Sequence, residues 1–354
     1  MPCGRCGFVS AAGGYHQHMA SADSSLTVAV TGPTGTFGFG LMPLLQEDSR
    51  ISRIIGIARR PFEPAEHGWT KMEYRQGDVR NPKALENAFQ GADVVIHLAF
   101  MITGTSTRQA TREINIDGTL NAFRAAAAAG ASRFVYASSV AAYGFHRDNP
   151  IGMTEDWPVR PATRLFYAQE KAELEQLLRA ESIAYPTLDL YLLRPPVVLG
   201  PHAVGAKDVL PGPLAPLARR LAATVRRFRL PIPVLVPALP MQFIHEEDVA
   251  QALLLCTVAA GPPGAYNITG DGVVTAADVA RELGLVPLPV PARIVQSAAR
   301  TASALPPLPF TPPALEWVEA ASHPAIMDAG KAKRELGWKP RYSSLEALRT
   351  TIQR

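Results

Sequence analysis

Short runs of apolar and β-branched residues alternate with amphipathic stretches along the first half of the chain. The short runs predict strands at Leu26–Thr31, Arg53–Ala58, Met72–Arg75, Asp93–Ala99, Arg133–Ser138 and Leu188–Arg194. Helical periodicity fills most of the intervals, for example at Asn115–Ala129 and Arg164–Ala180. Strands that alternate with helices form crossover units, so the pattern predicts an α/β fold with an open, doubly wound parallel sheet.

The pattern changes after the sixth predicted strand. Ten prolines fall between Pro195 and Pro240, and more prolines follow between Pro287 and Pro313. Because proline cannot donate a backbone hydrogen bond to a sheet, we expect loops and short helices here, forming a smaller C-terminal lobe. The sheet domain is then expected at residues 26–194 plus about 241–270, and the lobe at 195–240 and 271–354. Residues 1–25 lack periodicity and predict a disordered leader, within which Met19 is an alternative start.

The composition excludes several classes of protein. The chain has 354 residues, of which 47% are hydrophobic, so it can build a sizeable core. Its 35 basic and 31 acidic residues are too evenly balanced to indicate binding to nucleic acid or to a membrane surface. Three cysteines give no disulfide framework, and we expect no metal site. Because no apolar signal segment is evident either, we expect a cytoplasmic protein.

A glycine-rich turn directly follows the first predicted strand. It consists of Thr31, Gly32, Pro33, Thr34, Gly35, Thr36, Phe37 and Gly38. Glycines at this spacing let the backbone turn tightly and approach a pyrophosphate, and the N-terminus of the next helix supplies free N–H groups. The turn therefore predicts dinucleotide binding, with Thr31, Gly32, Thr34, Gly35, Thr36, Phe37 and Gly38 as contacts.

The end of the second predicted strand carries information on the choice of cofactor. NAD-binding folds usually have an acidic residue here, whereas this chain has Ala58 followed by Arg59 and Arg60. A guanidinium group suits a 2′-phosphate, so we expect NADP to be preferred over NAD. The alternative is that both arginines are simply solvated. Asp78, after the third strand, is placed to bond the adenine amino group.

A tyrosine and a lysine lie four residues apart in the segment Tyr167-Ala-Gln-Glu-Lys171. On a helix these residues share a face, and a nearby cation stabilises phenolate, which predicts a Tyr167 pKa below its usual value of about 10. Tyr167 is thus a candidate proton donor to a carbonyl or acceptor from an alcohol. Ser139, after the fifth predicted strand, offers a hydroxyl at the sheet edge where ligands of open α/β sheets bind. A capping role is the alternative for this serine.

From about Leu26 to the C-terminus, the chain resembles an extended short-chain dehydrogenase/reductase of the NAD-dependent epimerase/dehydratase family. The resemblance is carried by Thr31–Gly38, Asn115–Thr119, Ser139 before Tyr143-Gly144, Tyr167 with Lys171, Leu193–Pro195, Phe243–Val249 and Leu336–Pro340. It implies a Rossmann-type fold with a substrate-binding C-terminal lobe, and hydride exchange between nicotinamide C4 and a secondary alcohol or ketone carbon.

The resemblance also implies a role for each site residue. Ser139 matches the serine that binds the substrate oxygen, and Tyr167 matches the general acid/base. Lys171 matches the residue that holds the nicotinamide ribose and lowers the tyrosine pKa. Asn115 matches an asparagine near the active site, with a helical packing role as its alternative. Further cofactor contacts are expected at Val79, Leu98, Ala99 and Pro195.

Departures from the family pattern narrow the substrate. Sugar 4,6-dehydratases of this family carry Thr-Asp-Glu where this chain has Ser139-Val140-Ala141, which argues against a dehydratase. Val197 and Met241 replace an asparagine and an arginine that contact the diphosphate in nucleotide-sugar epimerases. The candidate pocket residues are mostly apolar: Met101, Ile102, Ala141, Phe166, Pro196 and Val197.

We therefore expect an NAD(P)-dependent oxidoreductase that acts on a small, fairly apolar ketone or alcohol. The alternatives are a nucleotide-sugar epimerase similar to UDP-glucose 4-epimerase, and an NADP-sensing binding protein without activity. Relatives of the second kind typically lose the catalytic tyrosine, which this chain keeps as Tyr167. Assembly into a homodimer through the helices Asn115–Ala129 and Arg164–Ala180 stays open.

Overall fold

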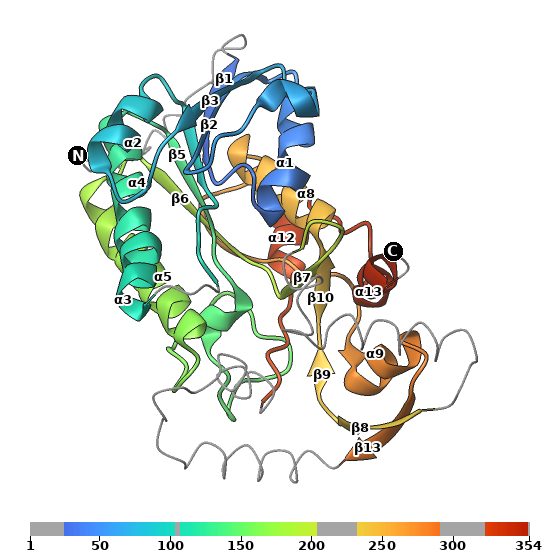
Figure 1. Cartoon of the computed structure of the whole chain (residues 1–354). Helices are drawn as coiled ribbons and strands as arrows, with labels where there is room; N and C mark the ends of the chain where they lie inside the picture. The colour runs from blue at the N-terminus through green and yellow to red at the C-terminus, as the bar shows by residue number, and fades with distance from the viewer. Residues whose placement is uncertain (1–24, 103–106, 204–231, 291–322, 353–354) are drawn as a thin grey trace, which may run out of the picture.

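A seven-stranded parallel sheet forms the centre of the structure (Figure 1). The computed structural model describes residues 25–102, 107–203, 232–290 and 323–352. The strands of the sheet are β1 (Leu26–Thr31), β2 (Ile51–Ala58), β3 (Met72–Gln76), β4 (Val94–His97), β5 (Arg133–Ala137), β6 (Asp189–Arg194) and β11 (Gly264–Asn267). Their order is β11-β6-β5-β4-β1-β2-β3, and every neighbouring pair is parallel. The order reverses between β1 and β4, which is where such sheets bind their ligands.

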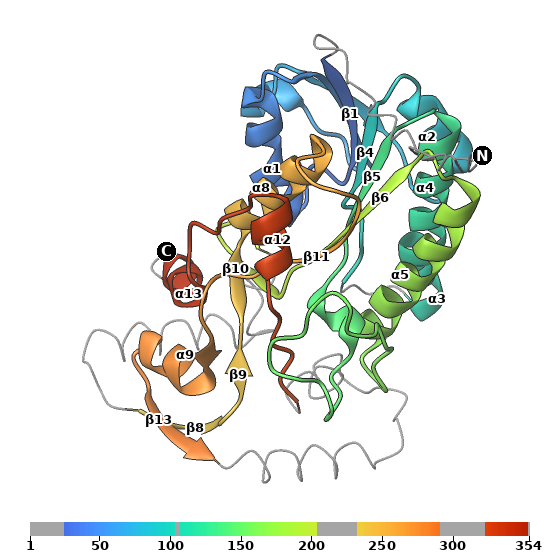
Figure 2. The same cartoon turned by 180° about the vertical axis from the view of Figure 1, so that it is seen from behind.

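Helices cover both faces of this sheet, as Figures 1 and 2 show from opposite sides. One face carries α1 (Thr36–Glu47), α8 (Glu246–Thr257) and α12 (Gly330–Glu335). The other face carries α2 (Pro82–Phe89), α4 (Gly118–Ala128) and α5 (Phe166–Ala184). Because both faces are covered, the strands are apolar on both sides, which explains continuous runs such as Val28-Ala29-Val30. The predicted doubly wound α/β fold is confirmed.

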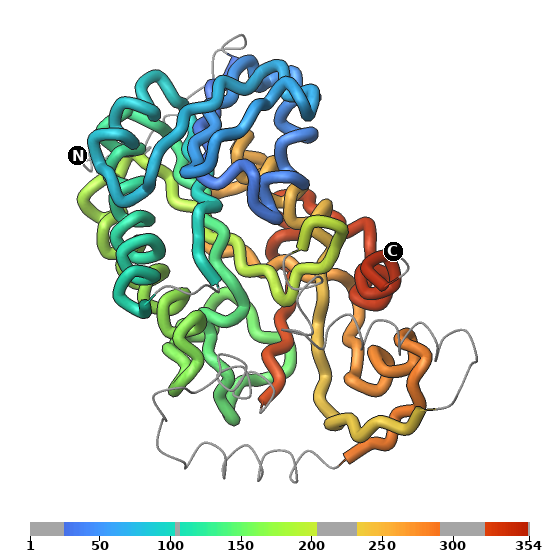
Figure 3. Tube along the Cα trace, in the orientation of Figure 1, coloured from blue at the N-terminus to red at the C-terminus, as the bar shows by residue number. Residues whose placement is uncertain are grey.

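Short helical elements lie in the connections between the strands of the sheet. They are the 3-10 turns η1 (Pro64–His67) and η3 (Val140–Tyr143), the helix α3 (Arg108–Arg112) and the π-helical turn η2 (Glu113–Asp117). The helix predicted at Asn115–Ala129 therefore begins with a π turn and continues as α4. The chain path in Figure 3 shows α3, η2 and α4 following one another beside α5.

The remaining elements lie mostly away from the sheet (Figures 1 and 3). They are β7 (Val197–Leu199), β8 (Pro233–Pro237), β9 (Pro240–Met241), β10 (Phe243–His245), β12 (Val274–Thr275), α9 (Ala276–Glu282), β13 (Val286–Val290) and α13 (Ser344–Ile352). Three small two-stranded sheets pair β10 with β7, β12 with β9, and β13 with β8.

The prediction of loops and short helices in the proline-rich part was wrong for β8 and β13. These two strands pair in parallel although each contains two prolines or more. Val286 donates its N–H to Ile232 O at 2.9 Å, so the next nitrogen, that of Pro287, faces away from the partner strand. Successive backbone nitrogens of a strand point alternately toward and away from the partner strand, so every proline nitrogen in β8 and β13 points away. No hydrogen bond between the two strands is therefore lost.

The C-terminal residues pack onto the sheet domain rather than standing apart from it. Trp338 is fully buried and donates from its indole nitrogen to Asp248 O at 3.0 Å. The Asp248 carboxylate accepts the backbone N–H groups of Arg341 and Tyr342. These bonds join two motifs that lie far apart in the sequence. The division into a sheet domain and a lobe stays a prediction, and the predicted leader at residues 1–25 lies almost wholly outside the described residues.

The part of the chain that the structure describes has no helix that is both long and apolar enough to span a bilayer.

Candidate active site

The glycine-rich turn lies between β1 and α1, at the reversal of the strand order. Gly32 has a φ of +71°, and a Cβ there would lie 3.0 Å from Ala99 N. At Gly38 an added Cβ would lie 2.1 Å from Pro33 O, so only glycine lets α1 approach the turn. Both positions thus require glycine for the reason that the sequence pattern predicts.

The residues around this turn fit a dinucleotide. No side chain caps the N-terminus of α1, where Gly35 is the N-cap, and the first turn holds no acidic residue. A helix that begins in this way presents free N–H groups and a partial positive charge to phosphate oxygens. The turn is fixed from two sides: Gly32 donates to Ile57 O at 2.8 Å, and Thr36 donates from its hydroxyl to His202 O at 3.0 Å.

The two arginines at the end of β2 are both exposed, and their backbone is held in place. The Tyr74 hydroxyl donates to Ala58 O at 3.0 Å and also to Arg60 O. The Gln76 amide donates to Arg59 O at 2.8 Å. These bonds fix the backbone of the two arginines and leave their side chains exposed at the end of β2.

Asp78 is engaged differently from the expectation. Its carboxylate forms a bidentate ion pair with Arg80, with Nη2 and Oδ2 2.7 Å apart. Hydrogen bonding to Arg80 lowers the pKa of Asp78, and the charge of Arg59 lowers it further. The structure thus assigns the Asp78 carboxylate to an arginine, and a contact with adenine stays a prediction.

The tyrosine and the serine of the predicted catalytic set meet. Tyr167 lies in the first turn of α5, and Ser139 ends the segment after β5 and caps η3 by accepting from Ala141 N at 3.1 Å. A hydrogen bond with the Ser139 side chain lowers the pKa of Tyr167, but burial raises it more, so the net shift is upward. The cap role and the contact with Tyr167 coexist at Ser139.

Lys171 lies one turn further along α5, with its ammonium group 5.9 Å from the centre of the Tyr167 ring and bonded to residues of β5. It donates to Tyr136 Oη at 2.9 Å and to Ala137 O at 2.8 Å, and it lies 3.7 Å from the centre of the Phe100 ring. Burial lowers the pKa of Lys171 to about 7, although the charges of two glutamates oppose that shift. The predicted lowering of the Tyr167 pKa is therefore not seen in this structure, because burial raises it and the lysine bonds elsewhere.

Asn115 is fully buried in the π turn, and its amide group is saturated. Its Nδ2 donates to Met101 O at 2.9 Å and to Glu170 Oε2 at 2.7 Å, while its Oδ1 accepts from Met101 N at 2.7 Å. The side chain thus holds the chain after β4 against α5. This geometry favours the packing role over direct contact with substrate, and π turns often occur beside functional sites.

A buried hydrogen-bond chain connects the glycine-rich turn to Asn115 through His97. Thr31 Oγ1 accepts from Ala99 N and lies 2.9 Å from His97 Nδ1; Thr119 Oγ1 donates to Asn115 O at 2.5 Å and lies 3.0 Å from His97 Nε2. A hydroxyl has one proton, so Nδ1 accepts from Thr31 and Nε2 donates to Thr119. Burial, followed by the charge of Lys171, lowers the pKa of His97 to about 3, which keeps the ring neutral.

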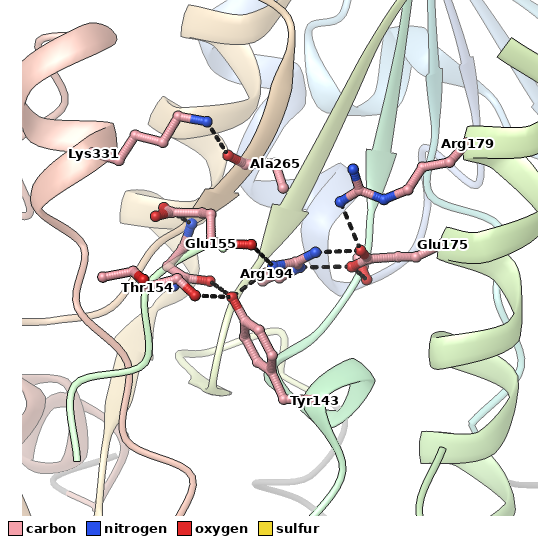
Figure 4. Close-up of polar contacts among 10 residues, drawn as sticks. Tyr143, Thr154, Glu155, Glu175, Arg179, Arg194, Ala265 and Lys331 are labelled. Atoms are coloured by element: carbon pink, nitrogen blue, oxygen red, sulfur yellow. Dashed lines mark hydrogen bonds and ion pairs between the residues drawn. The ribbon is translucent and has the colours of Figure 1, made fainter. Parts of the chain in front are cut away.

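A buried ion pair, which no sequence pattern indicated, joins β6 to α5 (Figure 4). Arg194, the last residue of β6, binds Glu175 of α5, and Arg179 approaches the same carboxylate at 3.5 Å. Arg194 also donates to the Tyr143 hydroxyl at 2.6 Å, and Ser138 donates to Glu175 at 2.6 Å. Ser138 is therefore occupied in the core, which leaves Ser139 as the serine available to a ligand.

The other predicted contacts surround the same sheet edge. Leu98 donates to Thr31 O at 3.1 Å, Val79 packs against Gly118, and Pro195 accepts from Val140 N at 2.9 Å. Among the predicted pocket residues, Ile102 and Val197 are exposed by 51% and 56%.

A family model and several known proteins resemble this chain. The model of the NAD dependent epimerase/dehydratase family matches residues 28–269. An uncharacterised protein of Mycobacterium tuberculosis (strain ATCC 25618 / H37Rv) is 26% identical over 91% of this chain and 82% of its own. A ceramide reductase of Caulobacter vibrioides is 32% identical over 66% of this chain and 62% of its own.

A solved structure shares the fold at low sequence identity. The UDP-glucose 4-epimerase of Thermotoga maritima superposes with a TM-score of 0.67 over 93% of this chain and 98% of its own, at 20% identity.

Proposed function

The chain belongs to the NAD-dependent epimerase/dehydratase family of enzymes, and from this premise we propose that it is an NADP-preferring oxidoreductase for a fairly apolar ketone or secondary alcohol. The observation that carries the proposal is the pairing of Tyr167 with Ser139 at the sheet edge beside the glycine-rich turn. A phenol and a hydroxyl that share a hydrogen bond there can bind one substrate oxygen between them.

Ser139, Tyr167 and Lys171 have different roles in the proposed reaction. Ser139 donates to the substrate oxygen and orients it toward Tyr167. In the reducing direction Tyr167 gives its phenolic proton to that oxygen, and in the oxidising direction the phenolate takes the alcohol proton back. The bound dinucleotide supplies or accepts the hydride at nicotinamide C4. Lys171, which now bonds Tyr136 and Ala137 O, would turn to hold the nicotinamide ribose.

Three observations support NADP as the cofactor. No acidic residue stands at Ala58, where NAD-binding folds hold the ribose hydroxyl. Arg59 and Arg60 are exposed there, and hydrogen bonds from Tyr74 and Gln76 to their carbonyl oxygens fix their backbone. A guanidinium group gains more from a phosphate than from a hydroxyl.

The apolar character of the substrate is supported by two of the predicted pocket residues and by a relative. Val197 and Ile102 expose apolar side chains, and Val197 stands where nucleotide-sugar epimerases carry a polar phosphate contact. The similar protein of Caulobacter vibrioides is named for ceramide, an apolar compound. The runner-up is a nucleotide-sugar epimerase, which is supported by a fold shared with enzymes such as that of Thermotoga maritima.

A substrate screen with a matched variant tests the proposal. NADPH absorbance is followed over ketones of increasing apolar area, and NADP⁺ reduction over the corresponding alcohols, with UDP-sugars as the epimerase arm. Tyr167→Phe keeps the ring but removes the proton donor, so we expect turnover to fall about 10²–10⁴-fold with cofactor affinity nearly unchanged. Near-normal turnover of Tyr167→Phe would overturn the proposal, and epimerisation of a UDP-sugar without net cofactor turnover would favour the runner-up.

A further inference from the structure

Glu170 is a buried acid that stands directly before Lys171 in α5. The side chain is 1% exposed. Its Oε2 accepts from the Asn115 amide at 2.7 Å, while Oε1 is buried without a hydrogen-bond partner among the described residues. Leaving a buried acceptor unpaired is unfavourable. A packing role alone does not explain an acid here, because a glutamine could accept the same bond from Asn115.

The bonded carboxylate oxygen of Glu170 helps to hold a segment of the predicted substrate pocket in place. Asn115 donates to Glu170 and, through the same amide group, holds both the N–H and the carbonyl of Met101. Met101 follows β4 and is one of the predicted pocket residues. Glu170 therefore fixes the position of this segment through Asn115, without reaching the pocket itself.

The charge of Glu170 acts on Lys171. The two hydrogen-bond acceptors of the Lys171 ammonium, Tyr136 Oη and Ala137 O, are both neutral. Two carboxylates favour its charged form, that of Glu175 more strongly than that of Glu170. Glu175 is also bound to Arg194 at 2.5 Å, whereas Glu170 has no ion-pair partner at bonding distance among the described residues. Burial raises the pKa of Glu170, and the hydrogen bond from Asn115 and the charges of Arg112 and Lys171 oppose that shift.

Other charged and titratable groups face this pair from the neighbouring elements. They are Arg112 of α3, Glu173 and Tyr167 of α5, Tyr136 of β5 and His97 of β4. Arg112 is bound to Glu173 through two hydrogen bonds of 2.7 Å, and His97 is neutral. Neither Arg112 nor His97 therefore compensates for the loss of the Glu170 charge.

We propose that Glu170 is a positioning residue of the active site, which fixes the Met101 segment through Asn115 and places a buried carboxylate next to Lys171 in α5. The second half rests on the proposed function, in which Lys171 works as an ammonium group. An ammonium group holds the ribose hydroxyls and supports the phenolate of Tyr167, whereas a neutral amine does neither as well.

The direct test is a titration of Lys171 that needs neither substrate nor cofactor. The chain contains seven lysines, so selective ¹⁵N-lysine labelling gives a short NMR spectrum, and the Lys171 signal is assigned by its loss in Lys171→Arg. Glu170→Gln keeps an acceptor for Asn115 but removes the charge. We expect it to lower the pKa of Lys171 by about one unit, because loss of a nearby anion disfavours the cation. Glu181→Gln, on the same helix but paired with Arg124 at the surface, is the control and leaves the titration unchanged.

A second variant separates the two halves of the proposal. Glu170→Ala removes both the charge and the acceptor, so it lowers the Lys171 pKa and also raises the KM for the substrate found in the screen. Glu170→Gln should keep the KM of the unchanged protein, because it still accepts the bond from Asn115. Its Lys171 pKa should be lowered as in Glu170→Ala. An unchanged Lys171 titration in Glu170→Gln overturns the charge role, and equal KM values for all variants overturn the positioning role. Failure of the proposed function is distinct, because it appears as an active Tyr167→Phe variant.

Discussion

Arg194 and Glu175 form a buried ion pair. The guanidinium Nη2 lies 2.5 Å from the carboxylate Oε2, and the two side chains are 1% and 0% exposed. Arg194 Nε donates to the second carboxylate oxygen at 2.8 Å, so the contact is bidentate (Figure 4). The pair joins the end of β6 to the helix that carries Tyr167, and despite burial the charge of Arg194 holds the pKa of Glu175 below its usual value.

Removal of one partner leaves the other charge buried and unpaired. We therefore expect Glu175→Ala to lower the free energy of unfolding by about 3–5 kcal/mol. Glu282→Ala is the control, because Glu282 pairs with Arg349 at the surface and such pairs contribute at most about 1 kcal/mol. Urea denaturation at pH 7 measures both. A loss below 1 kcal/mol in Glu175→Ala would contradict the assignment, and the double variant Glu175→Leu/Arg194→Met should recover most of the loss.

His97 makes the stability of the fold depend on pH. Its pKa is about 3 in the folded chain but about 6.5 when unfolded, so the unfolded state binds one more proton between these values. The contribution of His97 is fully present above pH 6.5 and is lost as the pH falls, at about 1.4 kcal/mol per unit. Urea midpoints measured between pH 5 and 7.5 should show this slope.

A variant comparison isolates the histidine from the carboxylates that titrate nearby. His97→Gln removes the titrating ring, so the slope between pH 5 and 6.5 should flatten by one proton, whatever the stability of the variant at pH 7. His146→Gln, at a half-buried position outside the hydrogen-bond chain, should keep the slope of the unchanged protein. Equal slopes in all three proteins would show that His97 is not held neutral.

The elements that follow a clear local pattern could be predicted from the sequence. β1 was predicted with its observed bounds, because a buried central strand is apolar throughout and a glycine turn ends it. β11 was missed, since its four residues Gly264–Asn267 are too few to show a periodicity. The proline content predicts loops at β8 and β13. Composition gives the number of prolines but not the direction in which each nitrogen points.

At the site, the sequence revealed which residue types are present but not how they bond. The four-residue spacing of Tyr167 and Lys171 predicts one helix face, and the structure places both on α5. It does not reveal that the ammonium turns to Tyr136, which lies 35 residues away in the sequence. The roles of Glu170 and Glu175 were hidden for the same reason. Helical glutamates are usually solvated, and only the fold shows that these two are buried.

The arginines after β2 should decide the choice between cofactors. A charge-assisted hydrogen bond contributes about 1.5–3 kcal/mol, so we expect NADP(H) to bind roughly tenfold or more tightly than NAD(H). The double variant Arg59→Ala/Arg60→Ala should bind the two cofactors alike. Arg53→Ala is the matched control, since Arg53 lies on the same strand and bonds Glu73. Calorimetric titrations of both cofactors give the comparison for each of the three proteins, and equal affinity or a preference for NAD in the unchanged protein would refute the argument.

The three residues of the catalytic set should fail in different ways when each is replaced. Ser139→Ala removes a donor to the substrate oxygen, so it lowers turnover and leaves cofactor affinity unchanged. Lys171→Ala weakens cofactor binding as well as the rate, because we expect the ammonium group to serve both. Tyr167→Phe loses only the proton transfer, about 3–5 kcal/mol in barrier.

Single-turnover rates and cofactor titrations on the three variants separate these effects. The sharpest contrast is between lysine and serine, since Lys171 lies one turn from the tyrosine on α5 and Ser139 bonds it from η3, and only the lysine is expected to reach the ribose. If Lys171→Ala bound NADPH as tightly as the unchanged protein, the ammonium group would have no role at the cofactor. Its bonds to Tyr136 and Ala137 O would then be its final arrangement, with the lysine serving to join α5 to β5.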